Sequence, residues 1–229
     1  MERTRRQESA KPGAPAALVS VASGRVALEG ALQLPAGSTG VVLFAHGSGS
    51  SRHSPRNNFV AQRLRAARLG TLLIDLLTPE EDADYERRFD IALLADRLAD
   101  AVRFLRNDGR TANLPVGLFG ASTGAAAALQ VAAQMPEAIA AVVSRGGRPD
   151  LAGAAVLGGV RAPTLLIVGG HDYGVIELNQ GAHAALGCVR ELAIVPGATH
   201  LFEERGALEE VARLAAAWFS RHLQRMAGA

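Results

Sequence analysis

Short apolar stretches, rich in β-branched residues and ending in glycine or a polar residue, alternate along the chain with stretches of helical spacing. The six apolar stretches are VVLFAH (41–46), TLLIDL (71–76), PVGLFG (115–120), IAAVVS (139–144), PTLLIVGG (163–170) and VRELAIVP (189–196). Because they are continuously apolar rather than alternating, we expect strands that are buried on both faces of a parallel sheet. Helices are expected between them, at about 56–68, 89–107, 122–134, 174–186 and 203–225. This order predicts an α/β fold with a doubly wound, mostly parallel sheet flanked by helices.

Two further segments complete the predicted organisation. Residues 18–34 alternate between apolar and polar side chains around Gly24, which predicts a pair of strands at the start of the domain. Residues 1–16 are polar and contain two prolines. We therefore expect a flexible N-terminal segment over 1–16 and a single domain over 17–229.

The stretch 89–107 has the pattern of an amphipathic surface helix. Its apolar residues recur every three or four positions, at Ile91, Leu94, Leu98, Val102 and Leu105. Its charged residues fall between these positions and are expected on the helix surface: Arg97, Asp100, Arg103 and Arg106. We expect this helix to be structural.

Composition and charge narrow the possible function classes. The 229 residues carry a net charge of +2, and much of the positive excess lies in the first eleven residues, so the domain has no basic stripe for nucleic acid. The single cysteine, Cys188, cannot form a disulfide within the chain, which suits a reducing compartment. No apolar stretch approaches the ~20 residues that span a bilayer, and no signal-peptide core follows the basic N-terminus. We expect a soluble cytoplasmic protein, either a monomer or a homodimer, that binds neither nucleic acid nor membrane.

Candidate chemistry lies where the predicted strands end, because open parallel sheets bind ligands outside the carboxyl ends of their strands. The sequence GASTG places Ser122 between a predicted strand and a predicted helix, with Gly120 and Gly124 two residues away on each side. A turn this tight lifts the serine side chain out of the sheet and requires very small neighbours. Ser122 is therefore a candidate nucleophile, and the alternative is that its side chain only caps the helix.

A serine hydroxyl needs a base, and the base needs an acid that orients it. Of the six histidines, His200 both follows a predicted strand and comes after Ser122 and Asp172 in the chain. Asp172 follows the strand TLLIV and is the candidate acid. Asp150 is the reserve candidate, and Asp75 ends another strand as a structural residue.

Acyl transfer also requires backbone amides that stabilise a developing oxyanion. Thr123, directly after the candidate nucleophile, would supply one amide. The other would come from the loop HGSGSS (46–51), with Ser48 as the first candidate donor and Gly49 as the alternative. An anion-binding nest or a simple turn is the other interpretation of this loop.

Several charged residues flank these positions in the sequence. Arg145 and Arg148 could hold an acidic group of a substrate, because a guanidinium matches carboxylate geometry. Arg52, and also Gly49, are further candidates for substrate contacts. The alternative is that the arginines bind loop carbonyls or nearby acids.

Together these motifs resemble the α/β-hydrolase fold, and within it the dienelactone hydrolase family. The resemblance covers about residues 18–225 and rests on HGSGSSRHSPRN, FGASTGAAAAL, SRGGRPDLAG, LLIVGGHD and VPGATHLFEE. It implies a triad of Ser122, Asp172 and His200 and requires no metal or organic cofactor. Dienelactone hydrolases proper use a cysteine nucleophile, so the dienelactone substrate is not carried over. The segment 144–163 is short, which implies a minimal lid or none and an open site.

The sequence therefore predicts a serine hydrolase that cleaves carboxylic esters of small, soluble substrates through an acyl-enzyme. One alternative is a thioesterase, lactonase or acyltransferase that uses the same triad. Another is a binding module that keeps the hydrolase fold without catalysis. A complete set of nucleophile, base, acid and oxyanion loop argues against the binding module.

Overall fold

The computed structural model describes residues 16–223 of the chain. Apart from Ala16, the predicted flexible segment 1–16 lies outside the described residues. Among residues 16–223, no helix combines the length and the apolar character needed to cross a bilayer.

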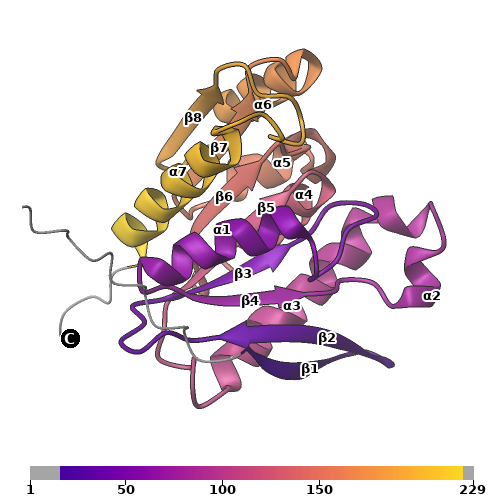
Figure 1. The fold of residues 1–229 in the computed structure, drawn as a ribbon. Coiled ribbons are helices and arrows are strands. Elements are labelled where there is room, and N and C mark those ends of the chain that lie inside the picture. Colours follow the sequence, from indigo (N-terminus) through magenta and orange to yellow (C-terminus); the bar gives the residue numbers. More distant parts are fainter. Residues whose placement is uncertain (1–15, 224–229) are drawn as a thin grey trace, which may run out of the picture.

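One twisted sheet forms the centre of the fold, and within the described residues it has eight strands in the order β1-β2-β4-β3-β5-β6-β7-β8 (Figure 1). The antiparallel pair at one edge confirms the strands expected within 18–34, and β2 also runs antiparallel to β4. From β4 to β8 all pairings are parallel, as the apolar stretches predict. The strands are β1 (Ala17–Ser23), β2 (Val26–Gln33), β3 (Val41–Ala45), β4 (Gly70–Ile74), β5 (Val116–Ala121), β6 (Ile139–Arg145), β7 (Thr164–Gly169) and β8 (Arg190–Val195).

Helices cover both faces of this sheet. On one face α1 packs beside α7, and on the other α3 packs beside α4, with α5 and α6 next to them (Figure 1). The helices are α1 (Pro55–Ala66), α2 (Pro79–Asp82), α3 (Ile91–Asn107), α4 (Thr123–Gln134), α5 (Ala154–Gly159), α6 (Tyr173–Ala185) and α7 (Ala207–His222), with short 3-10 helices η1 (Arg87–Phe89) and η2 (Pro149–Ala152). The five long helices confirm the predicted ones, whereas the four short helices α2, η1, η2 and α5 were not placed by the sequence pattern.

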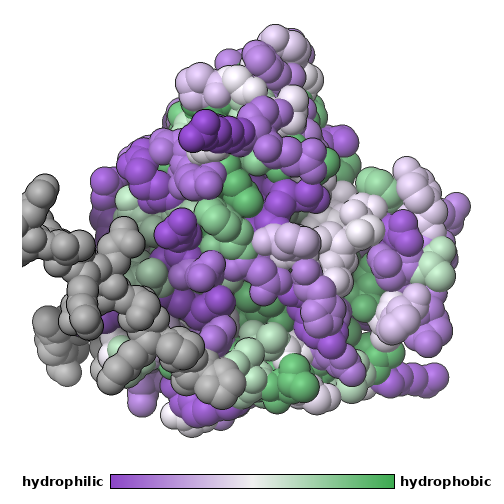
Figure 2. Space-filling model, viewed as in Figure 1, coloured by the Kyte–Doolittle hydropathy of each residue, from purple (hydrophilic) through white to green (hydrophobic). Residues whose placement is uncertain are grey.

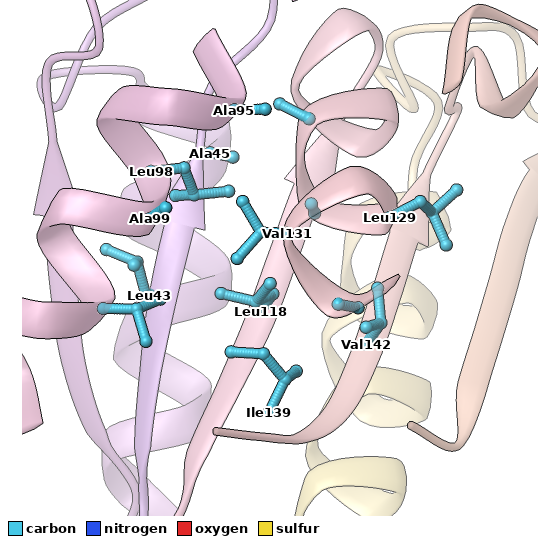
Figure 3. Close-up of a cluster of buried hydrophobic side chains, with 14 of the residues drawn as sticks. Leu43, Ala45, Ala95, Leu98, Ala99, Leu118, Leu129, Val131, Ile139 and Val142 are labelled. Atoms are coloured by element: carbon cyan, nitrogen blue, oxygen red, sulfur yellow. The ribbon is translucent and has the colours of Figure 1, made fainter. Parts of the chain in front are cut away.

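The two helical layers explain why the central strands are continuously apolar. Successive residues of β3 and β5 point to opposite faces, where each meets a helical layer. Leu43 and Leu118 pack against α3 and α4, as Figure 3 shows. Their neighbours Phe44 and Phe119 point to the α1 and α7 side, where their ring centroids lie 4.8 Å apart. The outer surface of the molecule in this view is mainly hydrophilic, with smaller apolar areas (Figure 2).

The last strand differs from the expected pattern. Both faces of β8 were expected to be buried, but Arg190 and Glu191 are exposed and Ile194 is 41% exposed. This strand lies at the sheet edge and has a strand neighbour only on the β7 side. Charged residues on an edge strand oppose pairing with another chain.

Arg97 corrects a second expectation. It was predicted on the surface of α3, but it is buried, and its guanidinium donates to both carboxylate oxygens of Glu81, at 2.5 and 2.6 Å. It also donates to the carbonyl of Leu76 at 2.9 Å. Glu81 lies in α2, and its side chain accepts from the backbone N–H of Thr78 while its own N–H donates to the Thr78 hydroxyl. Arg97 therefore joins three segments: α3, α2 and the chain directly after β4.

Candidate active site

Ser122 lies at a sharp turn between β5 and α4. Its backbone has φ 50° and ψ −121°, a positive-φ conformation that a non-glycine residue adopts only under constraint. Its hydroxyl makes no capping bond to the helix, and within residues 16–223 it makes no hydrogen bond at all. The alternative that Ser122 is only a helix cap therefore loses its geometric basis.

The small residues around this turn are required by close backbone contacts. A Cβ atom on Gly120 would lie 2.4 Å from the Cα of Ala125. One on Gly124 would lie 2.3 Å from the carbonyl oxygen of Ala45, at the end of β3. No real Cβ tolerates these distances, so the strand and the helix approach closely only because both positions are glycine.

His200 and Asp172 are brought together from two other strand ends. Asp172 lies between β7 and α6, and His200 follows β8. The distance between His200 Nδ1 and Asp172 Oδ2 is 2.6 Å, which is a short charge-assisted hydrogen bond. The Asp172 carboxyl is largely buried, and the His200 imidazole is 39% exposed. This bond orients the ring so that its other nitrogen, Nε2, is free of the acid.

The reserve candidate Asp150 and the strand-end residue Asp75 both have other partners. Asp150 accepts two hydrogen bonds from Arg148, at 2.9 and 2.7 Å, and does not contact His200. Asp75 accepts from the backbone N–H of Arg52 at 2.6 Å and also pairs with the Arg52 guanidinium. Both acids therefore hold loops, and Asp172 alone of the three is bonded to the histidine.

The loop that follows β3 lies directly against the start of α4. The backbone N–H of Ser48 donates to the hydroxyl oxygen of Thr123 at 3.0 Å, so the two candidate oxyanion donors are neighbours. Thr123 is the first residue of α4, where backbone N–H groups have no acceptor within the helix. The Ser48 amide, in contrast, is already bonded and would have to share its hydrogen with an oxyanion.

A cavity of about 210 Å³ contains the candidate nucleophile and base. Ser122 and His200 both line it, but no hydrogen bond joins their side chains among the described residues. The distance between a nucleophile and its base is often longer in an empty site than during reaction. The other lining residues are Gly47, Ser48, Ser50, Ser54, Arg56, Ala121, Arg145 and Leu201.

Arg145 stands out among these lining residues. It is 8% exposed, and within residues 16–223 its side chain has no hydrogen-bond or ion-pair partner. Its guanidinium lies 5.8 Å from the ring centroid of Phe202. Burial, together with repulsion from the nearby Arg56, lowers the pKa of Arg145 to about 10. The group still carries its charge at neutral pH, next to the candidate nucleophile.

The other predicted substrate contacts lie elsewhere. Arg148 is bonded to Asp150 and does not line the cavity with Ser122. Arg52 lines a separate cavity of about 410 Å³, which shares Ser50 with the first. Gly49 lines neither cavity, and its φ of +65° shows that it serves the turn of this loop. Of these four predicted contacts, only Arg145 lies at the cavity.

Arg56 is among the charged residues that flank the candidate site in the sequence, and it lies at the cavity although no substrate contact was predicted for it. It lies in the first turn of α1 and donates to Glu203 at 3.2 Å. The N-cap of this helix, Ser54, also lines the cavity, so the end of the 46–51 loop and the start of α1 form one wall. The signal was present in the sequence, since Ser54 before Pro55 marks a helix start directly after the candidate oxyanion loop.

His46 also follows a strand, yet it is part of the core. Its Nε2 accepts a hydrogen bond from the backbone N–H of Leu76 at 2.9 Å, and its Nδ1 lies 3.0 Å from the carbonyl of Gly47. Burial lowers the pKa of His46, so the ring is neutral. Within the described residues, no group of three or more His, Cys, Asp or Glu side chains is arranged to hold a metal ion.

Known proteins share both the sequence and the fold of this chain. The chain is 58% identical over 205 residues to two curated Mycobacterium tuberculosis proteins, each named as a putative phosphoribosyl transferase. The match covers 90% of this chain but only 46% of each relative, so the chain spans about half of their length.

Solved structures give a more complete match. A crystal structure of a dienelactone hydrolase from Anabaena variabilis is 56% identical, with a TM-score of 0.88, and the match covers 91% of this chain and 98% of that one. A Xanthomonas campestris protein described as an α/β serine hydrolase without a lid has a TM-score of 0.74 at 20% identity, covering 93% and 98% of the two chains. At that identity the likeness concerns the fold alone.

The family assignment follows from these matches. The model of the dienelactone hydrolase family matches residues 80–227. Between β6 and β7 the described chain has only η2 and α5, so the α/β-hydrolase fold is present here without a large inserted lid. The matched region includes all three residues of the predicted triad, and this chain belongs to the dienelactone hydrolase family.

Proposed function

We propose that this chain is a serine hydrolase that cleaves carboxylic esters of small, water-soluble substrates. The observation that carries the proposal is the 2.6 Å bond between His200 and Asp172, at a cavity that Ser122 also lines. Family membership and the similarity to a dienelactone hydrolase support hydrolysis in general. The small volume of the cavity and the absence of a large inserted lid favour short, soluble esters over long lipids.

In the proposed reaction, the Ser122 hydroxyl oxygen attacks the ester carbonyl while His200 Nε2 accepts its proton. Asp172 stabilises the resulting imidazolium through Nδ1. The amides of Thr123 and Ser48 stabilise the tetrahedral oxyanion. The intermediate collapses as the C–O bond to the alcohol breaks, and His200 returns its proton to the leaving alkoxide. Water, activated by His200, then cleaves the acyl-enzyme and releases the acid.

A nucleophile substitution tests this proposal directly. Wild-type protein should hydrolyse short p-nitrophenyl esters and should react covalently with a fluorophosphonate at Ser122. Ser122→Ala should lose labelling and reduce the ester rate by a factor of at least about 10³ while it stays folded. A folded Ser122→Ala protein that keeps the wild-type rate would refute a serine mechanism and would favour a binding module on the same fold.

Arg145 supports a more specific proposal, namely that the substrate carries an acidic group near its scissile carbonyl. A buried guanidinium without an anionic partner is costly, and a substrate carboxylate or phosphate would offset this cost. Arg56 also lines the cavity, but it is already paired with Glu203, so Arg145 is the arginine there that lacks an acidic partner within the described residues. Planar guanidinium groups bind such anions in a bidentate manner.

Paired substrates separate this proposal from general esterase activity. The p-nitrophenyl half-ester of succinic acid should have a kcat/KM at least about 10-fold higher than the neutral p-nitrophenyl butyrate. Arg145→Gln should remove this preference and leave hydrolysis of the neutral ester within about threefold. Equal values for both substrates in the wild type would refute the anion proposal while leaving the ester hydrolase proposal intact.

The names of the curated relatives suggest a second activity for the proteins that contain this domain. We infer that phosphoribosyl transfer belongs to the part of those relatives outside the match, since the shared part is matched over nearly its whole length by a dienelactone hydrolase. The present chain should therefore release no pyrophosphate from 5-phosphoribosyl pyrophosphate with any nucleobase acceptor. Thioester or lactone cleavage, or acyl transfer to another alcohol, would use the same triad and is distinguished by a panel of those substrates.

A further inference from the structure

We propose that Asn179 is a positioning residue for the predicted triad, acting through the backbone segment 144–148. This inference rests on the proposed hydrolase function but concerns a residue in the middle of α6. Asn179 lines none of the cavities beside the 46–51 loop. Asn179 connects α6, which begins directly after Asp172, with the segment 144–148, which is hydrogen-bonded to the backbone of Ser122.

The segment 144–148 holds the backbone of Ser122 on both sides of its side chain. The N–H of Ser122 donates to the carbonyl of Arg145 at 3.3 Å, and the N–H of Arg148 donates to the carbonyl of Ser122 at 3.1 Å. The strained dihedral angles of Ser122 persist only when neighbouring structure determines them. These two hydrogen bonds supply that restraint from outside the turn itself.

The same segment also lies against the candidate base. A Cβ on Gly146 would be 3.2 Å from the carbonyl oxygen of His200 and 3.5 Å from its Cε1 and Nδ1 atoms. The N–H of Gly146 donates to the carbonyl of Ile167 in β7 at 2.8 Å, and its φ is +50°. A change in the path of this segment would therefore move Ser122 and the His200 ring together.

Asn179 holds this segment from the helix. Its side-chain amide donates to the carbonyl of Gly147 at 3.0 Å and to the carbonyl of Val175, in its own helix, at 2.8 Å. The residue is fully buried. Asp172 is the N-cap of α6, so one helix provides both the acid that binds His200 and the amide that binds the segment beside His200.

The burial of polar atoms here argues for a positional role. The Asn179 Oδ1 atom and the Ser144 hydroxyl are both buried, and neither has a hydrogen-bond partner in the described structure. An unpaired buried polar atom destabilises the fold, so a leucine of similar shape would suit this core better if packing alone mattered. The presence of an amide at position 179 is explained by the hydrogen bond that it donates to the Gly147 carbonyl.

Asn179→Leu tests the proposal against a matched control. Thr111→Val also removes a buried hydrogen bond from a side chain to a carbonyl, the one from Thr111 to Leu105 at 2.6 Å. Thr111 lies after the C-terminal end of α3 and contributes to neither the predicted triad nor the segment 144–148. We expect Asn179→Leu to lower kcat for a short ester about 10- to 100-fold with KM within threefold, because small displacements of reacting groups have effects of this size. Fluorophosphonate labelling of Ser122 should slow by a similar factor, and Thr111→Val should keep wild-type values of both rates.

Amide hydrogen exchange gives a second measurement that needs no activity. In Asn179→Leu, or in Asn179→Ser if the leucine variant does not fold, exchange at Ser122 and Arg148 should accelerate at least about 10-fold relative to Thr111→Val. Unchanged exchange at these amides, or kcat and labelling within twofold of wild type, would overturn the positioning role. If the wild type itself neither labels nor cleaves esters, the hydrolase proposal fails, and the exchange measurement still decides whether Asn179 holds this segment.

Discussion

The imidazole of His200 and the carboxylate of Asp172 lie 2.6 Å apart, although 28 positions separate them in the chain. The contact forms because β7 and β8 are neighbouring parallel strands, so the residues that follow them meet at one edge of the sheet. Asp172 accepts from Nδ1 and leaves Nε2 available for the cavity, which is the tautomer a general base requires.

This contact predicts a specific loss in Asp172→Asn. The amide would favour the wrong tautomer of His200 and would not stabilise its protonated form, so kcat for a short ester should fall by about 10³- to 10⁴-fold. Steady-state kinetics checks this result. Asp150→Asn is the matched control, because Asp150 bonds only to Arg148 among the charged groups near the cavity, and its rate should stay within about threefold of wild type. If kcat falls little in Asp172→Asn but strongly in Asp150→Asn, then Asp150 and not Asp172 is the acid of the triad.

The close approach of α4 to β3 predicts that Gly124→Ala is strongly destabilising. The new methyl group would meet two backbone carbonyl oxygens, those of Ala45 and His46, at 2.3 and 2.5 Å. Because backbone atoms cannot rotate away, the free energy of unfolding should drop by about 3 kcal/mol or more, as measured by urea denaturation. Gly158→Ala, where nothing lies within 4 Å of the new atom, should be neutral or stabilising by up to about 1 kcal/mol.

The Glu81–Arg97 pair predicts sensitivity to acid. Its hydrogen bonds from Arg97 lower the pKa of Glu81 from 4.5 to about 2. A folded pKa below the unfolded one adds stability that is fully present above about pH 4.5 and is lost as the pH falls towards 2. Glu81→Gln should therefore be less stable than wild type by about 2 kcal/mol at pH 7, with the difference shrinking between pH 4.5 and 2.5. Urea titrations across this range test it, with Glu137→Gln, at an exposed and loosely paired position, as control.

His46 predicts a second pH dependence, closer to neutrality. Burial lowers its pKa below 6.5, and protonation would abolish the bond that Nε2 accepts from Leu76. The unfolded chain therefore binds this proton more readily, and stability should fall as the pH drops below about 6.5. The free energy of unfolding of His46→Gln should be lower than wild type at pH 7.5 but should change less between pH 7.5 and 5.5. If the free energy of unfolding of His46→Gln depends on pH as steeply as that of the wild type, the acid sensitivity belongs to another group.

Much of the fold could be predicted because hydrophobic periodicity is a local property. The six apolar stretches correspond to β3–β8, and the five predicted helices correspond to α1, α3, α4, α6 and α7. The error at β8 arose because an edge position depends on which strand has no further neighbour, and an apolar stretch does not encode that. The buried state of Arg97 depends on a helix, α2, whose start the capping box of Thr78 and Glu81 marks in the sequence, but whose contact with α3 it does not indicate.

The sequence by itself determined the residue types and chain order at the candidate site: Ser122 between small residues, then Asp172, then His200, each within four residues of the end of an apolar stretch. Only the tertiary structure decided which acid bonds to the histidine and which arginine reaches the cavity. Asp150 and Arg148 neutralise each other, while Arg145 is left buried and unpaired within the described residues beside Ser122. The physical reason is that periodicity and turn chemistry act between near neighbours, whereas bonding partners are chosen among groups that the folded sheet brings together.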